Sequence, residues 1–249
     1  MGMFLFIVLL IALWQGGYWF GVEVFAVFKS YSVPSPMGVG ECFIRLVSDG
    51  SLLQAAGYSL LRGIAGYVAA VLIGTLLGLL MNHFMYLQKN LKPVVLGIQT
   101  LPSVCWVPFS ILWFGLSTEA ILFVVVMGAA FSIAISVDNA IRNVPSIYKK
   151  AALTMGAQKQ QMYRYVIFPA CLPELISGLK QGWSFAWRAL MAGEVMTTSL
   201  GSGQTPIMRR DLADINQVML VMIVIILIGM LIDKCVFSVI EKQVMRKRE

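Results

Sequence analysis

The sequence predicts an all-α protein that crosses a membrane about six times. Hydrophobic residues make up 59% of its 249 residues, charged residues make up only 12%, and the mean hydropathy is +0.81. A soluble domain usually carries about a quarter charged residues. Six apolar stretches each approach or exceed the roughly 20 residues that a helix needs to cross a bilayer. A helix is also the only open-chain structure that satisfies its own backbone in lipid.

The predicted spans follow one another within a single transmembrane domain that covers residues 1–249. They occupy residues 3–28, 57–81, 93–116, 118–137, 174–197 and 217–240. The first stretch has no Lys or Arg before its apolar run and no small-x-small cleavage motif. We therefore expect it to be a retained span and not a signal peptide.

The linker at residues 29–56 contains the first break in the helical pattern. Val33-Pro34-Ser35-Pro36 interrupts any helix that reaches it. Polar Glu41, Arg45 and Asp49 then alternate with apolar residues, which suits a short amphipathic helix at the membrane interface. We expect this linker to be an external loop with an interfacial helix.

The second stretch carries glycines at helical spacing. Gly74 and Gly78 form a small-xxx-small pattern, preceded by Gly63 and Gly66. Small residues of this kind let two membrane helices approach closely. Glycine is also frequent in transmembrane helices generally, so an incidental pattern is the alternative. Arg62, near the outer end of the stretch, is expected to reach the lipid headgroups.

The third stretch is interrupted by two prolines. Pro102 and Pro108 bracket residues 103–107 in the middle of the predicted span, and proline removes a backbone hydrogen bond. Irregular backbone at membrane depth is tolerated only against protein or water. Pro102, Cys105 and Trp106 are therefore candidates for lining a path through the membrane. A purely structural kink is the alternative.

The fifth stretch contains charged residues at membrane depth, where an ionisable side chain is functional by default. Arg188 suits an anionic ligand, because a guanidinium forks onto carboxylate or sulfonate oxygens. Glu194 lies six residues further on and does not share its helix face. A structural ion pair between Arg188 and a Glu194 on another helix or another copy is the alternative. With Trp183 and Trp187 beside them, these residues complete the candidates for the path.

Basic residues predict which side of the protein faces the cytoplasm. The loops at residues 82–92 and 139–173 and the tail Arg246-Lys247-Arg248 are rich in Lys and Arg, whereas the linker at 197–216 has mixed charge. Cytoplasmic loops carry such an excess, and with an even number of spans both termini lie in the cytoplasm. This arrangement explains the net charge of +7 without nucleic-acid binding.

The residues that metal or nucleotide sites require are sparse. The four cysteines form no CxxC pair and His83 is the only histidine, so we expect neither a disulfide framework nor a metal site. The chain has no Gly-x4-Gly-Lys-Ser/Thr loop for phosphates, and Gly201-Ser202-Gly203 is not followed by a lysine. We expect no catalytic residues and no cofactor bound by this chain.

The polar, basic segment at residues 139–169 predicts two short helices. Pro145 and Ser146 suit a helix start, with Ser146 or Asn143 as the N-cap, and Gly156 provides a stop that tolerates positive φ. A second helix runs from about Gln158 to Phe168, where Pro169 marks the return to the membrane. A hairpin on the membrane surface, held by lipid charge, is the alternative to a partner-binding loop.

The spacing of Ala151, Ala152, Gly156 and Pro169 is similar to the cytoplasmic EAA loop of ABC-importer permeases, Glu-Ala-Ala-x3-Gly-x9-Ile-x-Leu-Pro. Nearly the whole chain resembles permeases of the nitrate/sulfonate/taurine/bicarbonate group. The other matching stretches are Ser59-Leu60-Leu61-Arg62-x3-Gly66, Leu101-Pro102-x3-Trp106-x-Pro108, Ile111-Leu112-Trp113-Phe114-Gly115, Ala186-Trp187-x6-Glu194, Asp233 and Glu241.

The resemblance implies a type I (MetI-like) permease fold in a bacterial inner membrane. It implies two permease copies, two ATPase subunits that bind ATP and Mg²⁺, and a separate extracytoplasmic binding protein. The coupling segment would be residues 145–157, with Lys150, Ala151, Ala152 and Gly156 against the ATPase and Pro169 at its exit. Lys150 departs from the motif, which has Glu there.

The function that the resemblance implies is translocation of a small solute, with an anion of the sulfonate, nitrate or taurine kind as the expected cargo. A separate periplasmic or lipid-anchored binding protein would deliver that solute. The alternative is a stand-alone membrane channel or a membrane-embedded enzyme. An intramembrane hydrolase needs a nucleophile and a base within its spans, where this sequence has no histidine and few acids.

Overall fold

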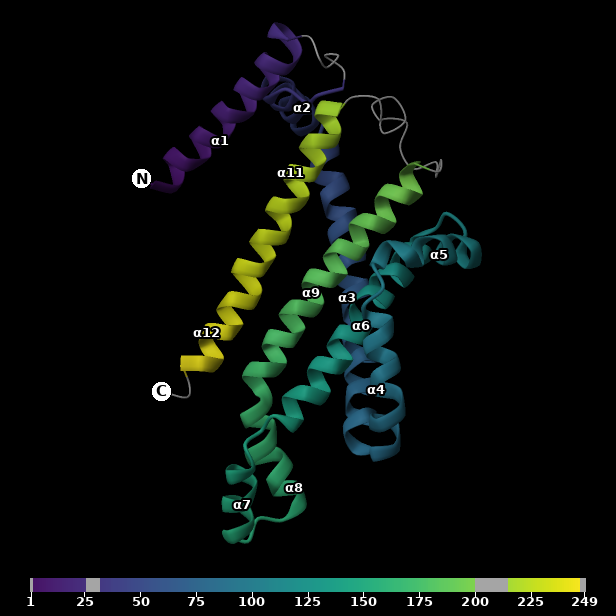
Figure 1. The fold of residues 1–249 in the computed structure, drawn as a ribbon, viewed down its shortest axis with the longest axis vertical. Coiled ribbons are helices and arrows are strands. Elements are labelled where there is room, and N and C mark those ends of the chain that lie inside the picture. The colour runs from purple at the N-terminus through teal and green to yellow at the C-terminus, as the bar shows by residue number, and fades with distance from the viewer. Residues whose placement is uncertain (1, 26–31, 200–214, 247–249) are drawn as a thin grey trace. The chain divides into compact units, whose positions relative to one another are not determined.

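The computed structural model describes residues 2–25, 32–199 and 215–246, which are helical apart from short connections and contain no strand (Figure 1). The predicted all-α class is thus confirmed for the described part of the chain. The chain divides into two compact units, Met1–Tyr58 with Gly203–Met230 and Ser59–Ser202 with Leu231–Glu249.

The first unit is organised around the short helix α2. It contains α1 (Gly2–Tyr18), the π-helical turn η1 (Trp19–Val24), α2 (Pro36–Ser48), the start of α3 (Ser51–His83) and most of α11 (Ile215–Ile232). The Ser35 hydroxyl accepts a hydrogen bond from the Gly38 N–H at 3.0 Å and caps α2. The apolar stripe of α2 buries Cys42 and Leu46 against Leu220 of α11. The predicted amphipathic helix is present, and its external location stays a prediction.

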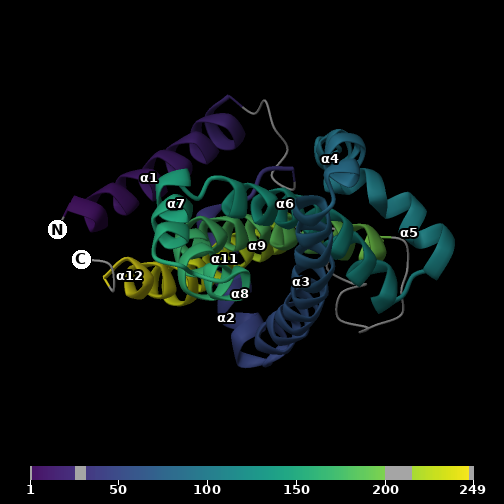
Figure 2. The same ribbon diagram turned by 90° about the horizontal axis from the view of Figure 1, so that it is seen from below.

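The second unit is built on two long helices that lie side by side, α6 and α9 (Figures 1 and 2). Its elements are the rest of α3, α4 (Met85–Gln99), the 3₁₀ turn η2 (Ser103–Trp106), α5 (Val107–Phe114), α6 (Thr118–Arg142), α7 (Ser146–Thr154), α8 (Lys159–Gln161), the π-helical turn η3 (Met162–Ile167), α9 (Phe168–Ser199), the π-helical turn η4 (Asp233–Phe237) and α12 (Ser238–Arg246).

Glycines on α3 bring that helix into close contact with α6. A Cβ added at Gly74 would lie 2.5 Å from the Ala130 carbonyl oxygen, and one at Gly78 would lie 2.6 Å from the Ala134 carbonyl oxygen. Real Cβ atoms do not approach that closely, so no side chain fits at either position. The predicted small-xxx-small face is confirmed as a packing face.

The helix α9 approaches α6 in the same manner from its own glycines. A Cβ at Gly182 would lie 2.5 Å from Ile133 Cγ1, and one at Gly178 would overlap the Ser136 side chain. On α6 itself, a Cβ at Gly128 would lie 2.7 Å from Ala189 Cβ. Close packing therefore supplies much of the attraction between these helices.

Each of the six predicted apolar stretches corresponds to a helix or a run of helical segments among the described residues. By length and composition, α3, α6 and the run Ile215–Glu241 are each able to cross a membrane, and the α4–α5 pair would make a fourth crossing. The first stretch is represented by the shorter apolar helix Val8–Val24. The fifth is α9, which is 32 residues long and carries several charged side chains.

The third stretch is sharply bent, as its prolines predict. The axis turns by 98° between Met85–Gln99 and Ser103–Phe114, and Figure 2 shows α5 leaving the direction of α4. Pro102 precedes η2 with ψ of 136°, which is outside the helical range, and Pro108 lies in the first turn of α5. The predicted interruption is confirmed.

Three local expectations differ from the structure. The basic segment 82–92 is not a loop, because α4 begins at Met85 and its face packs Val95 and Leu91 against Met81 of α3. Pro145 occupies the N-cap position of α7, with no side-chain cap, so neither Ser146 nor Asn143 serves there. The second helix does not end at Phe168, since η3 runs directly into α9 and Pro169 lies in the first turn of α9.

The contact between α3 and α6 predicts an unequal response to two alanine substitutions. Gly74→Ala should lower the free energy of unfolding by about 1–3 kcal/mol, because the new methyl overlaps the backbone of α6. Gly97→Ala on α4, where a Cβ meets nothing within 4 Å, is the matched control and should not destabilise. Thermal melting of both variants in detergent measures the difference, and equal melting temperatures would show that the glycine face does not hold the helices together.

Candidate functional site

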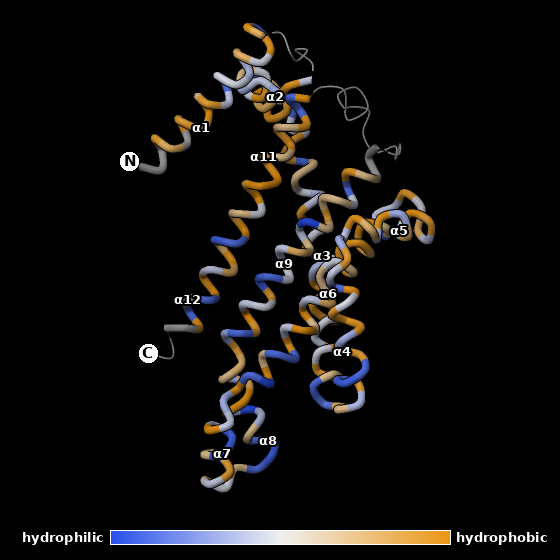
Figure 3. The backbone as a smooth tube through the Cα atoms, in the orientation of Figure 1, coloured by the Kyte–Doolittle hydropathy of each residue, from blue (hydrophilic) through white to orange (hydrophobic). Residues whose placement is uncertain are grey.

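The loop between α6 and α9 is a compact helical hairpin with its own small core. Ala152 of α7 is buried together with residues from the end of α6, from η3 and from the start of α9. The buried members of this core are Ala140, Val144, Ala152, Met162, Ile167 and Cys171. Figure 3 shows hydrophilic residues gathered in the α7–α8 region at the end of the long apolar helices. The loop is therefore a rigid projection and not a loose connection.

The end of α7 is fixed by Gly156, whose φ is +77°. The Ala157 N–H donates to the Ala152 carbonyl and the Gly156 N–H donates to the Leu153 carbonyl, both at 3.0 Å. These two bonds form the helix-ending motif that favours glycine in the left-handed conformation. The predicted stop at Gly156 is confirmed, and a Cβ there would meet nothing within 4 Å.

The exposed residues of the hairpin include both apolar and basic side chains. Tyr148, Leu153 and Met155 are exposed, and Met155 is 86% exposed. Lys150 and Ala151 are exposed as well, whereas Ala152 faces the inner core. The two alanines of the predicted coupling set thus lie on different faces of α7, one exposed and one buried. Pro169 is exposed in the first turn of α9.

The charge of this hairpin has one sign. Residues 143–173 contain Lys149, Lys150, Lys159 and Arg164 and no Asp or Glu. Because like charges without compensation need a complementary partner surface or solvent, the hairpin suits an acidic contact surface.

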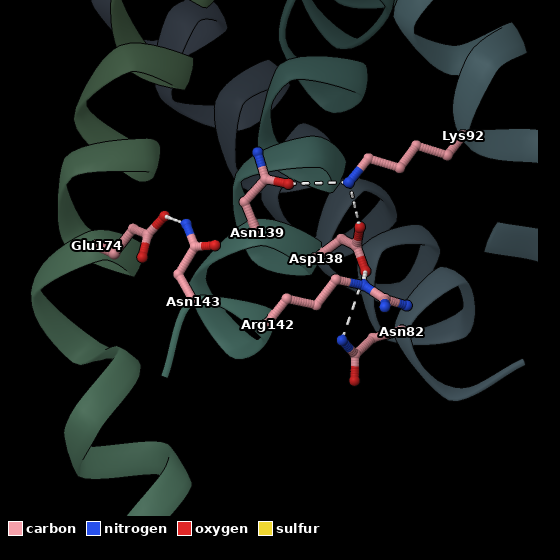
Figure 4. Close-up of polar contacts among 7 residues, drawn as sticks. All are labelled: Asn82, Lys92, Asp138, Asn139, Arg142, Asn143 and Glu174. Atoms are coloured by element: carbon pink, nitrogen blue, oxygen red, sulfur yellow. Dashed lines mark hydrogen bonds and ion pairs between the residues drawn. The ribbon is translucent and has the colours of Figure 1, made fainter. Parts of the chain in front are cut away.

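A charged cluster that the sequence analysis missed lies at the base of the hairpin (Figure 4). Asp138, near the end of α6, is 0% exposed. Its carboxylate lies 2.7 Å from Lys92 Nζ of α4 and 2.7 Å from Arg142 Nε of its own helix. The only sequence signal was an acid four residues before an arginine, which predicts a pair on one helix face. The partner on α4 had no sequence signal.

The bent third span lies next to the part of α9 that carries Arg188. The turn η2 contacts both α6 and α9, and a Cβ at Gly128 of α6 would lie 3.4 Å from Ser103 Cβ and 3.7 Å from the Phe185 carbonyl oxygen. Pro102 and Cys105 of this segment are exposed, and Trp106 is partly buried against Phe123.

Arg188 belongs to an exposed polar stripe on α9. Its guanidinium lies 4.7 Å from the centre of the Phe185 ring, and its Nε donates to the Ser184 carbonyl at 3.1 Å. Ser177, Gln181 and Ser184 are exposed on the same helix face, one turn apart. Polar side chains on one exposed face of a membrane helix indicate contact with water or protein and not with hydrocarbon.

The two tryptophans of the predicted path lie on another face of α9. Trp183 and Trp187 are buried and stack on each other with their ring centres 5.7 Å apart. Trp183 also contacts the rings of Tyr67 on α3 and Phe237 in η4. The structure brings η2, which contains Cys105 and Trp106, against α9, and it places both tryptophans of α9 in the helix packing.

Glu194 is paired with α3 and not with Arg188. Its carboxylate accepts a hydrogen bond from the Ser59 hydroxyl at 2.7 Å and lies 3.4 Å from Arg62 Nη1. Arg62, expected to reach the lipid headgroups, points instead at this carboxylate. A buried carboxylate attracts the cation more strongly than solvent-facing headgroups do. The roles of Glu194 and Arg188 in a translocation path stay predictions.

Metal-ligand clusters do not occur in the part of the chain that the structure describes, since no group of three or more His, Cys, Asp or Glu side chains converges there. Residues 29–31 of the predicted external loop, Gly201-Ser202-Gly203, most of the linker at 197–216 and the basic residues Lys247 and Arg248 lie outside the described residues.

Long packed apolar helices, a span broken at mid-length and a basic hairpin between two long helices are together typical of a polytopic membrane protein. The chain belongs to the family of binding-protein-dependent transport system inner membrane components, which it matches over residues 70–248. It is therefore a permease component of the ABC importer type, the family that the sequence analysis identified. Membership implies a multi-pass membrane protein that works with an ABC ATPase and a substrate-binding protein.

Curated relatives support this membership. The chain is 31% identical over 193 residues to a putative ABC transporter permease protein of Methanocaldococcus jannaschii, covering 77% of this chain and 72% of that one. It is 27% identical to the putative aliphatic sulfonates transport permease protein SsuC of Bacillus subtilis, over 96% of this chain and 84% of SsuC. It is 26% identical to the taurine transport system permease protein TauC of Escherichia coli, over 74% of this chain and 69% of TauC.

A solved structure confirms the predicted MetI-like fold. The chain is similar to an inward-facing form of the MetNI methionine ABC transporter, with a TM-score of 0.59 and 19% sequence identity. The match covers 78% of this chain and 95% of the other.

The two neighbouring alanines of α7 are expected to tolerate substitution unequally. Ala152→Leu overfills the hairpin core and should destabilise the hairpin by about 1–3 kcal/mol. Ala151→Leu adds a side chain on the exposed face and should leave the hairpin intact. Limited proteolysis of the purified protein measures this, with faster cleavage within residues 143–168 expected for Ala152→Leu alone. Equal cleavage of both variants would show that Ala152 does not hold the hairpin together.

Proposed function

We propose that this chain is the membrane-spanning permease of an ATP-driven importer for a small anionic solute, and that residues 145–157 dock on its ATPase. The observation that carries the proposal is the shape of the hairpin. One side of α7 packs into the hairpin core through Ala152, and the helix ends before Gly156. Apolar side chains on its other residues are exposed. A short exposed helix with a firm base suits a groove on another protein.

The charge of the hairpin supports a partner with a complementary surface. Lys150 occupies the position where the family motif has Glu, and the hairpin carries no acid that would neutralise it. We propose that the ATPase groove in contact with Lys150 carries carboxylates in place of the cations that a motif glutamate would require. Complementary charge of this kind chiefly sets partner choice and the rate of association.

The translocation path is proposed to run beside the polar stripe of α9 and the bend at η2. Arg188 belongs to this stripe, and η2, which follows Pro102, contacts the same helix α9. The relatives whose names state a cargo include permeases for aliphatic sulfonates, taurine and nitrate. A guanidinium matches the oxygens of such solutes. Trp183, Trp187 and Glu194 support the wall of the path from within the helix packing.

The assembly that follows is proposed to contain two copies of this chain, two ATPase subunits that bind ATP and Mg²⁺, and an extracytoplasmic binding protein. Its place is a bacterial inner membrane, with both termini in the cytoplasm. This chain then carries no catalytic residue, binds no cofactor or metal itself and does not bind nucleic acid. A stand-alone channel or membrane enzyme would need no ATPase, so co-purification separates these possibilities.

A pair of glycine substitutions tests the docking role of the hairpin. Gly156→Val forces a β-branched residue into positive φ, which costs about 1–2 kcal/mol. Gly50→Val imposes the same strain at φ +70°, between α2 and α3 and outside the hairpin. We expect the ATPase to co-purify with the Gly50 variant and to be lost from the Gly156 variant. Equal ATPase retention and equal uptake by the two variants would remove the hairpin as the docking site.

The role of Arg188 is tested by a charge series on uptake. Arg188→Met should lower uptake of the anion about tenfold or more, the loss expected for one charged hydrogen-bonding partner. Arg188→Lys should retain part of it, because it keeps the charge and loses the fork. Taurine, nitrate and a short alkanesulfonate are the probes, in vesicles that contain the whole transporter. Uptake by Arg188→Met at the level of the unsubstituted chain would exclude Arg188 from the path.

A further inference from the structure

The buried carboxylate of Asp138 joins three helices at the base of the hairpin. It accepts hydrogen bonds from Lys92 Nζ of α4 at 2.7 Å and from Arg142 Nε of α6 at 2.7 Å, with Asn82 of α3 at 3.4 Å (Figure 4). Lys92 Nζ also donates to Asn139 Oδ1 at 2.9 Å. The two cations connect different parts of the structure. Lys92 joins α4 to the Asp138 carboxylate of α6, whereas Arg142 lies on the same helix as Asp138.

The contacts around this cluster make the end of α6 and the start of α4 one rigid piece. Above the charges, Met81 of α3, Val95 of α4 and Ala134 of α6 are buried together. Below them, Asn143 Nδ2 donates to a Glu174 carboxylate oxygen at 2.6 Å and ties the entrance of the hairpin to the start of α9. Because Asp138 lies in α6 and the hairpin follows directly after α6, a movement of the hairpin displaces Asp138 as well.

The helix α4 leads from this cluster directly to the bend. Lys92 and Ser103 are separated by one stretch of helix and the Pro102 turn, and η2 then lies against α6 and α9 near Arg188. Pro93 removes one backbone hydrogen bond next to Lys92, but α4 continues through it to Gln99. These few helical turns connect a displacement at Lys92 to the bend. Bends of this kind between packed helices are where hinge motions concentrate.

We propose that Asp138 is a positioning residue for transport, which through Lys92 carries displacement of the hairpin to the bend between α4 and α5. The proposal rests on the proposed function, since the hairpin moves only if an ATPase acts on it. The Asp138–Lys92 pair is the mechanical link in this scheme, and the Asp138–Arg142 pair, four residues apart on α6, only balances the buried charge.

The distinction between the two pairs provides a matched test. Lys92→Met and Arg142→Met each remove one cation from the same buried carboxylate, which costs similar stability. Of the two substitutions, only Lys92→Met removes an ion pair that joins α4 to α6. The readout is the spectrum of a nitroxide spin label on Cys105. Cys235, the other exposed cysteine, is replaced by serine, and the two cysteines that remain besides Cys105 are buried. The sample is the full complex with its ATPase, compared with and without ATP and vanadate.

The expected result is a nucleotide-dependent change in the Cys105 spectrum of the unsubstituted complex, retained in Arg142→Met. In Lys92→Met that change should fall about threefold or more, while the ATPase stays bound and continues to hydrolyse ATP. If Lys92→Met does not fold, Lys92→Gln keeps a polar end without the charge and carries the same expectation.

Two results would overturn the inference alone. An equal loss of the spectral change in both variants would show that Asp138 only needs its charge balanced, and an equal retention would show that the link transmits nothing. Absence of an ATPase from the complex of the unsubstituted chain would overturn the proposed function and this inference with it. The co-purification step therefore distinguishes the two failures.

Discussion

Close packing of α6 between glycine faces is the constraint on which the second unit depends. The helix α3 contributes Gly74 and Gly78, and α9 contributes Gly178 and Gly182. Lipid removes the hydrophobic drive for helices to associate, so contact between backbones has to supply the attraction. At the bend, Gly128 of α6 leaves space for Ala189 in the same way. Because α6 is packed closely on two sides, it holds the hairpin that follows it in a fixed position.

Charge inside the unit follows from that packing. Asp138 and Glu194 are each placed where a second helix provides a cation, Lys92 in one case and Arg62 in the other. A buried carboxylate without such a partner would be strongly destabilising. Arg188 differs, because it lies on an exposed polar stripe and packs on an aromatic ring of its own helix. This contrast separates the two carboxylates that stabilise the helix packing from Arg188, which we propose meets the solute.

Much of the fold and part of the site follow from the sequence, because those features depend on local chemistry. The apolar stretches, the break between Pro102 and Pro108 and the stop at Gly156 each arise from requirements of a single backbone segment. The Asp138–Lys92 pair does not, because its members are 46 residues apart and only tertiary packing brings them together. The sequence also did not predict that Ala151 is exposed and Ala152 is buried. A nine-residue helix has too few turns to show a periodic pattern.

Photo-cross-linking from Met155, which is 86% exposed at the tip of the hairpin, is the most direct test of whether the hairpin docks on an ATPase. A photoreactive amino acid at that position, with one at the 73% exposed Met37 as control, is activated in membranes that contain the whole transporter. Docking predicts an adduct between Met155 and a nucleotide-binding ATPase, and none from Met37. Cross-links from Met155 only to lipid or to extracytoplasmic proteins would contradict it.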